Sequence, residues 1–225
     1  NTLGVQAVFP LPADMVRAQL ESVCGDIRPC AVKIGMLPDA QCVRAVSGAI
    51  RRYALEHIVI DTVFSASAGT VLQPEAAMRA AAEELYPLAE LLTPNIPEAE
   101  QLSGMRITAD AGCEAAARRI GERWGCAVLI KGGHRESGAD DVLYTANGTC
   151  RWFRAQKQPN PHTHGTGCTF SSAIAGYLAQ GCAVEQAVRR AKEFITGAVA
   201  DGFAIGHGRG PLNHFYSFYP STQGE

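Results

Sequence analysis

A glycine-rich turn that runs directly into a helix is the sharpest chemical signal in the sequence. His164-Gly165-Thr166-Gly167-Cys168 precedes a stretch whose apolar residues recur at helical spacing. Glycines let the backbone approach a ligand closely, and the first turn of a helix carries unpaired N–H groups and partial positive charge. Residues 165–168, which we call the anion cradle, are therefore suited to bind a phosphate. A turn that merely starts a helix is the alternative.

A second signal combines an amide with a carboxylate. Asn95 and Glu98 lie three residues apart in the segment from Thr93 to Glu98. Magnesium prefers such oxygen ligands and keeps several of its waters, so the pair could hold a hydrated Mg²⁺. The competing interpretation is a capping box, in which Asn95 caps a helix and the Glu98 side chain returns to the Asn95 backbone. Taken in isolation, these two residues favour the capping box.

Two further polar residues follow apolar runs. Asp61 comes directly after Val59-Ile60, and Lys131 comes directly before Gly132-Gly133. A turn-capping aspartate and a solvated lysine are the simpler readings. Combined with the anion cradle, however, an acid, a lysine and room for a nucleotide are what phosphoryl transfer needs, because positioning and charge neutralisation dominate that reaction. The sequence contains no G-x-x-x-x-G-K-[ST] segment, which excludes a P-loop protein.

The elements that must position these residues alternate along the chain. Apolar strands are expected at residues 31–37, 58–61, 91–94 and 127–131, and helices at 38–56, 74–85, 97–102, 108–124, 184–202 and from 165 onward. Asn147-Gly148 predicts a hairpin between residues 141–145 and 149–153. This pattern predicts one α/β domain over residues 1–225, with a mostly parallel sheet covered by helices on both faces. Ligands bind such sheets beyond the carboxyl ends of the strands.

Composition narrows the class of protein. The 225 residues are 47% hydrophobic and 19% charged, as in a globular protein. With 20 basic and 22 acidic residues, the chain has no basic footprint for nucleic acid, and no apolar run is long enough to span a membrane. The 8 cysteines form no C-x-x-C pair, which argues against a zinc site. No signal peptide is recognised, so we expect a cytoplasmic protein whose thiols are free and mostly buried.

Several segments, in order along nearly the whole chain, resemble one known family. They are residues 1–6, 32–37, 59–63, 92–99, 129–134, 163–169 and 208–215. They are similar to the hydroxymethylpyrimidine/phosphomethylpyrimidine kinases of the ribokinase-like superfamily. The resemblance implies a ribokinase-like fold, a homodimer, and use of ATP and Mg²⁺. It also implies phosphorylation of 4-amino-5-hydroxymethyl-2-methylpyrimidine, and then of its monophosphate, in thiamine biosynthesis.

The resemblance also implies roles for single residues. Amides of Gly165, Thr166 and Gly167 would stabilise the transferring phosphoryl group. Cys168 would act as the base or would only position the substrate hydroxyl, and residues 156–163 resemble the family's mobile flap. The other implied contacts are Lys131, Gly133, Asn95 and Glu98 for the nucleotide, Asp61, Asn95 and Glu98 for the metal, and Gly35, Met36, Val63 and His164 for the pyrimidine.

Two alternatives and one departure accompany this resemblance. A pyridoxal kinase of the same superfamily, or a relative that binds the pyrimidine without catalysis, would also retain these motifs. A purely structural interaction module would not explain them. The family has a further strand and helix, with a glycine-rich acidic loop, before the segment that matches Asn1. We therefore expect the sequence to be part of a longer gene product.

Overall fold

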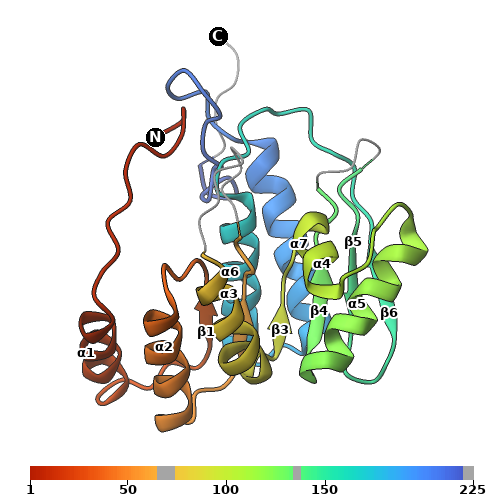
Figure 1. The fold of residues 1–225 in the computed structure, drawn as a ribbon. Helices are drawn as coiled ribbons and strands as arrows, with labels where there is room; N and C mark the ends of the chain where they lie inside the picture. Colours follow the sequence, from red (N-terminus) through yellow and green to blue (C-terminus); the bar gives the residue numbers. More distant parts are fainter. Residues whose placement is uncertain (65–73, 134–137, 220–225) are drawn as a thin grey trace.

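A six-stranded sheet forms the centre of the computed structural model, which describes residues 1–64, 74–133 and 138–219 (Figure 1). The strands lie side by side in chain order: β1 (Val32–Ile34), β2 (Ile58–Ile60), β3 (Leu91–Leu92), β4 (Ala127–Ile130), β5 (Asp141–Tyr144) and β6 (Cys150–Phe153). β1 to β4 are parallel, whereas β5 and β6 are antiparallel to their neighbours. The predicted α/β class, the mostly parallel sheet and the hairpin around Asn147-Gly148 are confirmed.

Helices cover both faces of this sheet. α2 (Ala40–Arg52), α3 (Glu75–Ala80) with the π-helical turn that continues it (Ala81–Leu85), and α5 (Asp110–Trp124) pack on one face, and α6 (Thr166–Ala179) and α7 (Val184–Ala200) pack on the other. Successive strand residues point to opposite faces. Ile58, Ile60 and Leu92 therefore belong to the first apolar layer, and Val59 and Leu91 belong to the second. A 3₁₀ turn (Tyr86–Leu88) and α4 (Ile96–Ser103) flank β3.

The helix α1 (Ala13–Cys24) was not predicted from the sequence. It packs beside α2 at the edge of the molecule that carries β1 (Figure 1). Pro12 precedes it without a side-chain capping hydrogen bond, and Ala13 is its one buried residue. Met15 and Val23 are both more than half exposed. α1 lacks the capping residue and the continuous buried stripe that identify a helix in a sequence.

The cysteines correct one expectation. All eight are free thiols, but only Cys42, Cys113 and Cys126 are buried. Cys30 and Cys168 are exposed, and the other three are partly exposed. The prediction that most of them are buried is therefore wrong. In the described part of the chain, no helix is both long and apolar enough to cross a membrane.

Candidate active site

The anion cradle lies over a buried ion pair at the carboxyl ends of the parallel strands. Lys131 follows β4 and Asp61 follows β2, and the Lys131 Nζ donates to the Asp61 Oδ1 at 2.6 Å. Their side chains are 15% and 2% exposed. A Cβ atom built on Gly167 would lie 3.6 Å from the Lys131 Nζ and 3.9 Å from the Asp61 Oδ2. The structure therefore brings together three of the predicted site elements that are far apart in the sequence.

Two hydroxyl groups to which no role was assigned from the sequence hold Asp61 in place. Thr93, directly after β3, donates from its Oγ1 to the Asp61 Oδ1 at 3.2 Å. Ser171, one turn into α6, lies 3.4 Å from the Asp61 Oδ2 and donates to the Gly167 carbonyl at 3.0 Å. Asp61 is thus fixed by three different elements. The available signal was positional: Thr93 ends a strand, and Ser171 lies four residues after Gly167 on the helix.

Asn95 and Glu98 form the capping box of α4, so the simpler reading of this motif is correct as geometry. The Asn95 Oδ1 accepts from the Glu98 N–H at 2.9 Å, and the Glu98 Oε2 accepts from the Asn95 N–H at 2.8 Å. The missed Thr62 donates to the same Glu98 oxygen at 3.1 Å. Glutamate is seldom buried unless it is paired, but Glu98 is only 5% exposed. Burial raises the pKa of Glu98, and the nearby Lys131 charge partly opposes this shift.

The side chains around Glu98 offer oxygen ligands, which fit a hydrated magnesium ion. The Glu98 Oε1 has no hydrogen-bond partner among the described residues, so it is available to a metal. Asp61 is close enough to raise the Glu98 pKa by repulsion. No group of three or more His, Cys, Asp or Glu side chains that could hold a metal occurs in the described ranges. An ion here would take few ligands from the protein and the rest from water and phosphate, as magnesium commonly does.

The start of α6 supplies backbone donors. Gly165 is the N-cap, with a φ of 88° in the left-handed region that favours glycine. No side chain caps the helix, because the N-cap is a glycine, and the neighbouring Thr166 hydroxyl donates to the Thr163 carbonyl at 2.7 Å. First-turn amides of a helix have no intrahelical acceptor. Cys168 is exposed in this turn. The Thr166 N–H donates to the Thr163 carbonyl at 3.3 Å, so the cradle presents its other first-turn N–H groups, and the Cys168 thiol, to a ligand.

The residues assigned to the pyrimidine occupy the same end of the sheet. Gly35 and Met36 follow β1, and Val63 follows β2. A Cβ atom on Gly35 would lie 3.0 Å from the Lys33 Nζ, so a larger residue would require the lysine side chain to move. Gly133 is exposed beyond β4, and His134 lies outside the described residues. Each of these positions follows a strand, as the topology requires.

The C-terminal segment holds the residues that precede the anion cradle. His164 is exposed, and its N–H donates to the Gly210 carbonyl at 3.1 Å. The Gly210 N–H in turn donates to the His162 Nδ1 at 3.0 Å. His214 lies 2.9 Å from the Thr169 hydroxyl in the first turn of α6. Residues 210–214 thus support the cradle from outside, which sequence reasoning did not anticipate.

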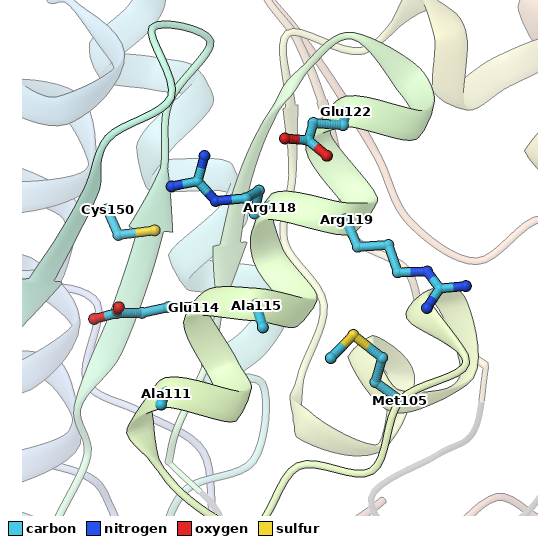
Figure 2. Close-up of a pocket in the computed structure, with 8 residues that line it drawn as sticks. All are labelled: Met105, Ala111, Glu114, Ala115, Arg118, Arg119, Glu122 and Cys150. Carbon is cyan, nitrogen blue, oxygen red and sulfur yellow. The ribbon is translucent and has the colours of Figure 1, made fainter.

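A surface groove of about 760 Å³ lies elsewhere, on α5 beside β6 (Figure 2). None of the predicted site residues lines it. Two of its charged side chains bind protein groups: the Glu114 Oε1 accepts from the Trp152 Nε1 at 2.6 Å, and the Arg118 Nη2 donates to the Gly148 carbonyl at 3.0 Å. The residues that line the groove are Met105, Ala111, Glu114, Ala115, Arg118, Arg119, Glu122 and Cys150.

Solved structures with the same architecture define the class. A Bacillus subtilis pyridoxal kinase in complex with ADP matches with a TM-score of 0.84 and 36% identity, over 93% of this chain and 78% of that one. A phosphomethylpyrimidine kinase from Clostridium difficile matches with a TM-score of 0.77 and 34% identity, over 88% and 81%. The fold is therefore ribokinase-like, and both of these structures are small-molecule kinases.

The family follows from the sequence comparison. The model of the phosphomethylpyrimidine kinase family matches residues 1–213. The hydroxymethylpyrimidine/phosphomethylpyrimidine kinase of Haemophilus influenzae is 38% identical over 219 residues, which are 96% of this chain and 81% of that protein. This chain belongs to the phosphomethylpyrimidine kinase family.

Proposed function

We propose that the chain transfers the γ-phosphoryl group of ATP to the hydroxymethyl group of 4-amino-5-hydroxymethyl-2-methylpyrimidine, and then to the resulting monophosphate, as a step in thiamine biosynthesis. One observation carries the proposal. In a chain of this family, the anion cradle lies directly over the Lys131–Asp61 pair at the carboxyl ends of the strands. Backbone donors, a cation and oxygen ligands therefore meet where this fold binds ligands.

On the nucleotide side, Lys131 is the cation for the phosphates. It is mostly buried but reaches the underside of Gly167, so a phosphate on the cradle would lie close to its ammonium group. Gly133 leaves room beyond the strand end. Amides of residues 165–167 would receive the charge that spreads over the phosphoryl oxygens during transfer. Preorganised donors need no rearrangement as the charge develops, whereas the Thr166 N–H would first have to leave the Thr163 carbonyl.

For the metal, Glu98 is the principal ligand in this proposal. Asn95 would contribute from the N-cap of α4, and Asp61, which is close enough to Glu98 to raise its pKa, would contribute negative charge. Magnesium, when bound, would neutralise part of the negative charge on the phosphates. The Thr62 hydroxyl and the backbone N–H of Asn95 orient the Glu98 carboxylate by donating to its Oε2.

Around the substrate, Cys168 is the side chain that approaches the reacting hydroxyl. It is exposed in the first turn of α6 and directly follows Gly167, the residue that lies over the Lys131 Nζ. In one role it accepts the hydroxyl proton, and in the other it only holds the hydroxyl in place. Gly35, Met36, Val63 and His164 would surround the pyrimidine ring.

The test is a direct comparison of two acceptors. The purified protein is incubated with ATP, Mg²⁺ and either the aminopyrimidine or pyridoxal, and the products are identified by mass spectrometry. We expect the pyrimidine mono- and diphosphate, with kcat/KM at least about tenfold above that for pyridoxal, a margin of about 1.4 kcal/mol. Pyrimidine binding without ATP consumption would contradict the proposal.

Pyridoxal phosphorylation is the second candidate, because a pyridoxal kinase matches this fold with a TM-score of 0.84. A preference for pyridoxal in the same experiment would select it. The homodimer and the cytoplasmic location stay predictions.

A further inference from the structure

A second buried ion pair lies behind the nucleotide side of the site. The Lys192 Nζ of α7 donates to the Asp141 Oδ2 at the start of β5, at 2.6 Å. The two side chains are 13% and 3% exposed. Lys192 also donates to the Ala139 carbonyl and lies 5.9 Å from the Phe170 ring on α6. The pair therefore joins the two helices behind the sheet to the loop between β4 and β5.

The other oxygen of Asp141 binds the backbone of the site. The Gly132 N–H donates to the Asp141 Oδ1 at 2.9 Å, and this N–H belongs to the residue directly after Lys131. On the opposite side, the Lys131 N–H donates to the Pro94 carbonyl at 2.8 Å. Consecutive amides are thus held from two directions. Between them they set the path on which the chain leaves β4 toward Gly133.

A side chain is needed here because the ladder has ended. β4 and β5 pair up to Ile130 and Val142. The next residues no longer form this ladder. Without Asp141, the buried Gly132 N–H would lose its acceptor, and an unpaired buried amide costs about 1–3 kcal/mol. Lys192 supplies the opposite charge that an ionised, buried Asp141 requires.

We propose that Asp141 is a positioning residue for nucleotide binding: its carboxylate fixes the Gly132 amide, and with it Lys131 and Gly133, while Lys192 holds the carboxylate. This inference rests on the proposed function, because the nucleotide is placed at Lys131 and Gly133. Neither Asp141 nor Lys192 touches the nucleotide in this arrangement. Their effect reaches it through the backbone of residues 131–133.

Two double variants separate the hydrogen bond from the ion pair. D141N/K192M keeps an acceptor for the Gly132 N–H, whereas D141L/K192M has nearly the same volume and the same charge but no acceptor. Binding of ADP is measured by calorimetry, and KM for ATP and for the pyrimidine by steady-state kinetics. We expect the Asn variant to bind ADP within threefold of wild type. We expect the Leu variant to bind ADP at least tenfold more weakly, with a raised KM for ATP and an unchanged KM for the pyrimidine.

Hydrogen exchange provides a readout that does not depend on catalysis. The Gly132 amide should be protected in wild type and in the Asn variant and unprotected in the Leu variant. If wild type binds no ADP, the proposed function fails and the nucleotide role of Asp141 fails with it, while exchange still reports whether Asp141 fixes the turn. Equal ADP affinity in both double variants would overturn the inference alone.

A folding defect is distinguished by a further variant. If D141L/K192M is unfolded by circular dichroism, D141V/K192M takes its place, since valine suits the start of a strand. Unfolding of both non-accepting variants would assign the pair to folding only and overturn the proposal. An equal rise in both KM values would do the same.

Discussion

The groove on α5 and the carboxyl end of the parallel strands hold their polar groups in different ways. The groove of about 760 Å³ is lined by side chains on the flank of α5, by Cys150 at the start of β6 and by Met105, which follows α4 (Figure 2). At the strand ends, by contrast, Asp61, Thr93 and Glu98 are between 0 and 5% exposed. Burial of charge is expensive unless partners compensate it. The strand ends therefore carry charges that stability alone would not favour.

Backbone donors explain this difference further. Most of the groove residues lie beyond the first turn of α5, where each N–H is used within the helix, so they offer side chains and no free backbone donors. Where α6 begins, first-turn amides have no intrahelical acceptor, and the parallel strands below it end together. The comparison shows that the candidate active site lies where strands and a helix have their ends, and not where the surface groove has the larger volume. Variants in each region can break or sharpen this conclusion.

The largest expected effect comes from Lys131→Met. It removes the cation under Gly167 and leaves the buried Asp61 without its ion-pair partner. We expect kcat/KM for ATP to fall by about 10³-fold or more, in line with the loss of transition-state charge stabilisation. Steady-state kinetics would measure this, with circular dichroism to confirm folding. A decrease of less than tenfold would place the phosphates away from Lys131.

A smaller effect is expected from Cys168→Ser. Serine keeps the volume of the side chain but holds its proton more tightly than a thiol, so it is a poorer base. If Cys168 is the base, kcat should fall by about 10²-fold, the lower range for general-base catalysis. ADP binding should be unchanged, because the backbone of the cradle is intact. Undiminished turnover would leave Cys168 only a positioning role.

Much of this site could be predicted from the sequence because the strand ends are marked by composition. Apolar runs followed at once by Asp61, by Thr93 to Asn95, and by Lys131 placed these residues at one sheet edge before any coordinates were known. The hairpin followed from Asn147-Gly148. Each of these signals is local, and a parallel topology converts local positions into one spatial cluster.

The parts that were missed depend on long-range contacts. Ser171 and Lys192 lie on helices, and nothing near them in the sequence reveals that they reach Asp61 and Asp141. The available hint was a lysine that follows the buried Ala191 of α7. α1 was missed because it buries almost nothing. Contacts between residues that are distant in the sequence, and not local propensity, determine the roles of these side chains and the position of this helix.

Glu98→Gln tests the cost of the buried charge. The pKa of Glu98 is raised from 4.5, so the folded state binds its proton more tightly than the unfolded state does. The stability that this gives is present at low pH and is lost as pH rises through the folded pKa. At neutral pH, E98Q should therefore be more stable by about 1 kcal/mol and should bind Mg²⁺ about tenfold more weakly. Chemical denaturation at two pH values would measure the first effect.

The control for E98Q is the pH dependence itself. The advantage of the variant over wild type should disappear as pH falls toward 4.5, the ordinary glutamate value, because wild-type Glu98 is then protonated as well. A stability gain that persists at low pH would show that the charge is not its cause. A loss of stability at neutral pH would mean that the hydrogen bonds from Thr62 and Asn95 outweigh desolvation.

The smallest effect is expected from Arg119→Met in the groove, the matched counterpart of Lys131→Met. Arg119 makes no hydrogen bond or ion pair among the described residues, unlike Arg118, which binds the Gly148 carbonyl. Its loss should change the free energy of unfolding by no more than about 0.5 kcal/mol, as for surface substitutions generally. Both KM values should stay within twofold of wild type. A larger change in KM for ATP would show that the groove is coupled to nucleotide binding at the strand ends. The groove and the buried strand ends could then no longer be treated as a structural region and a catalytic region.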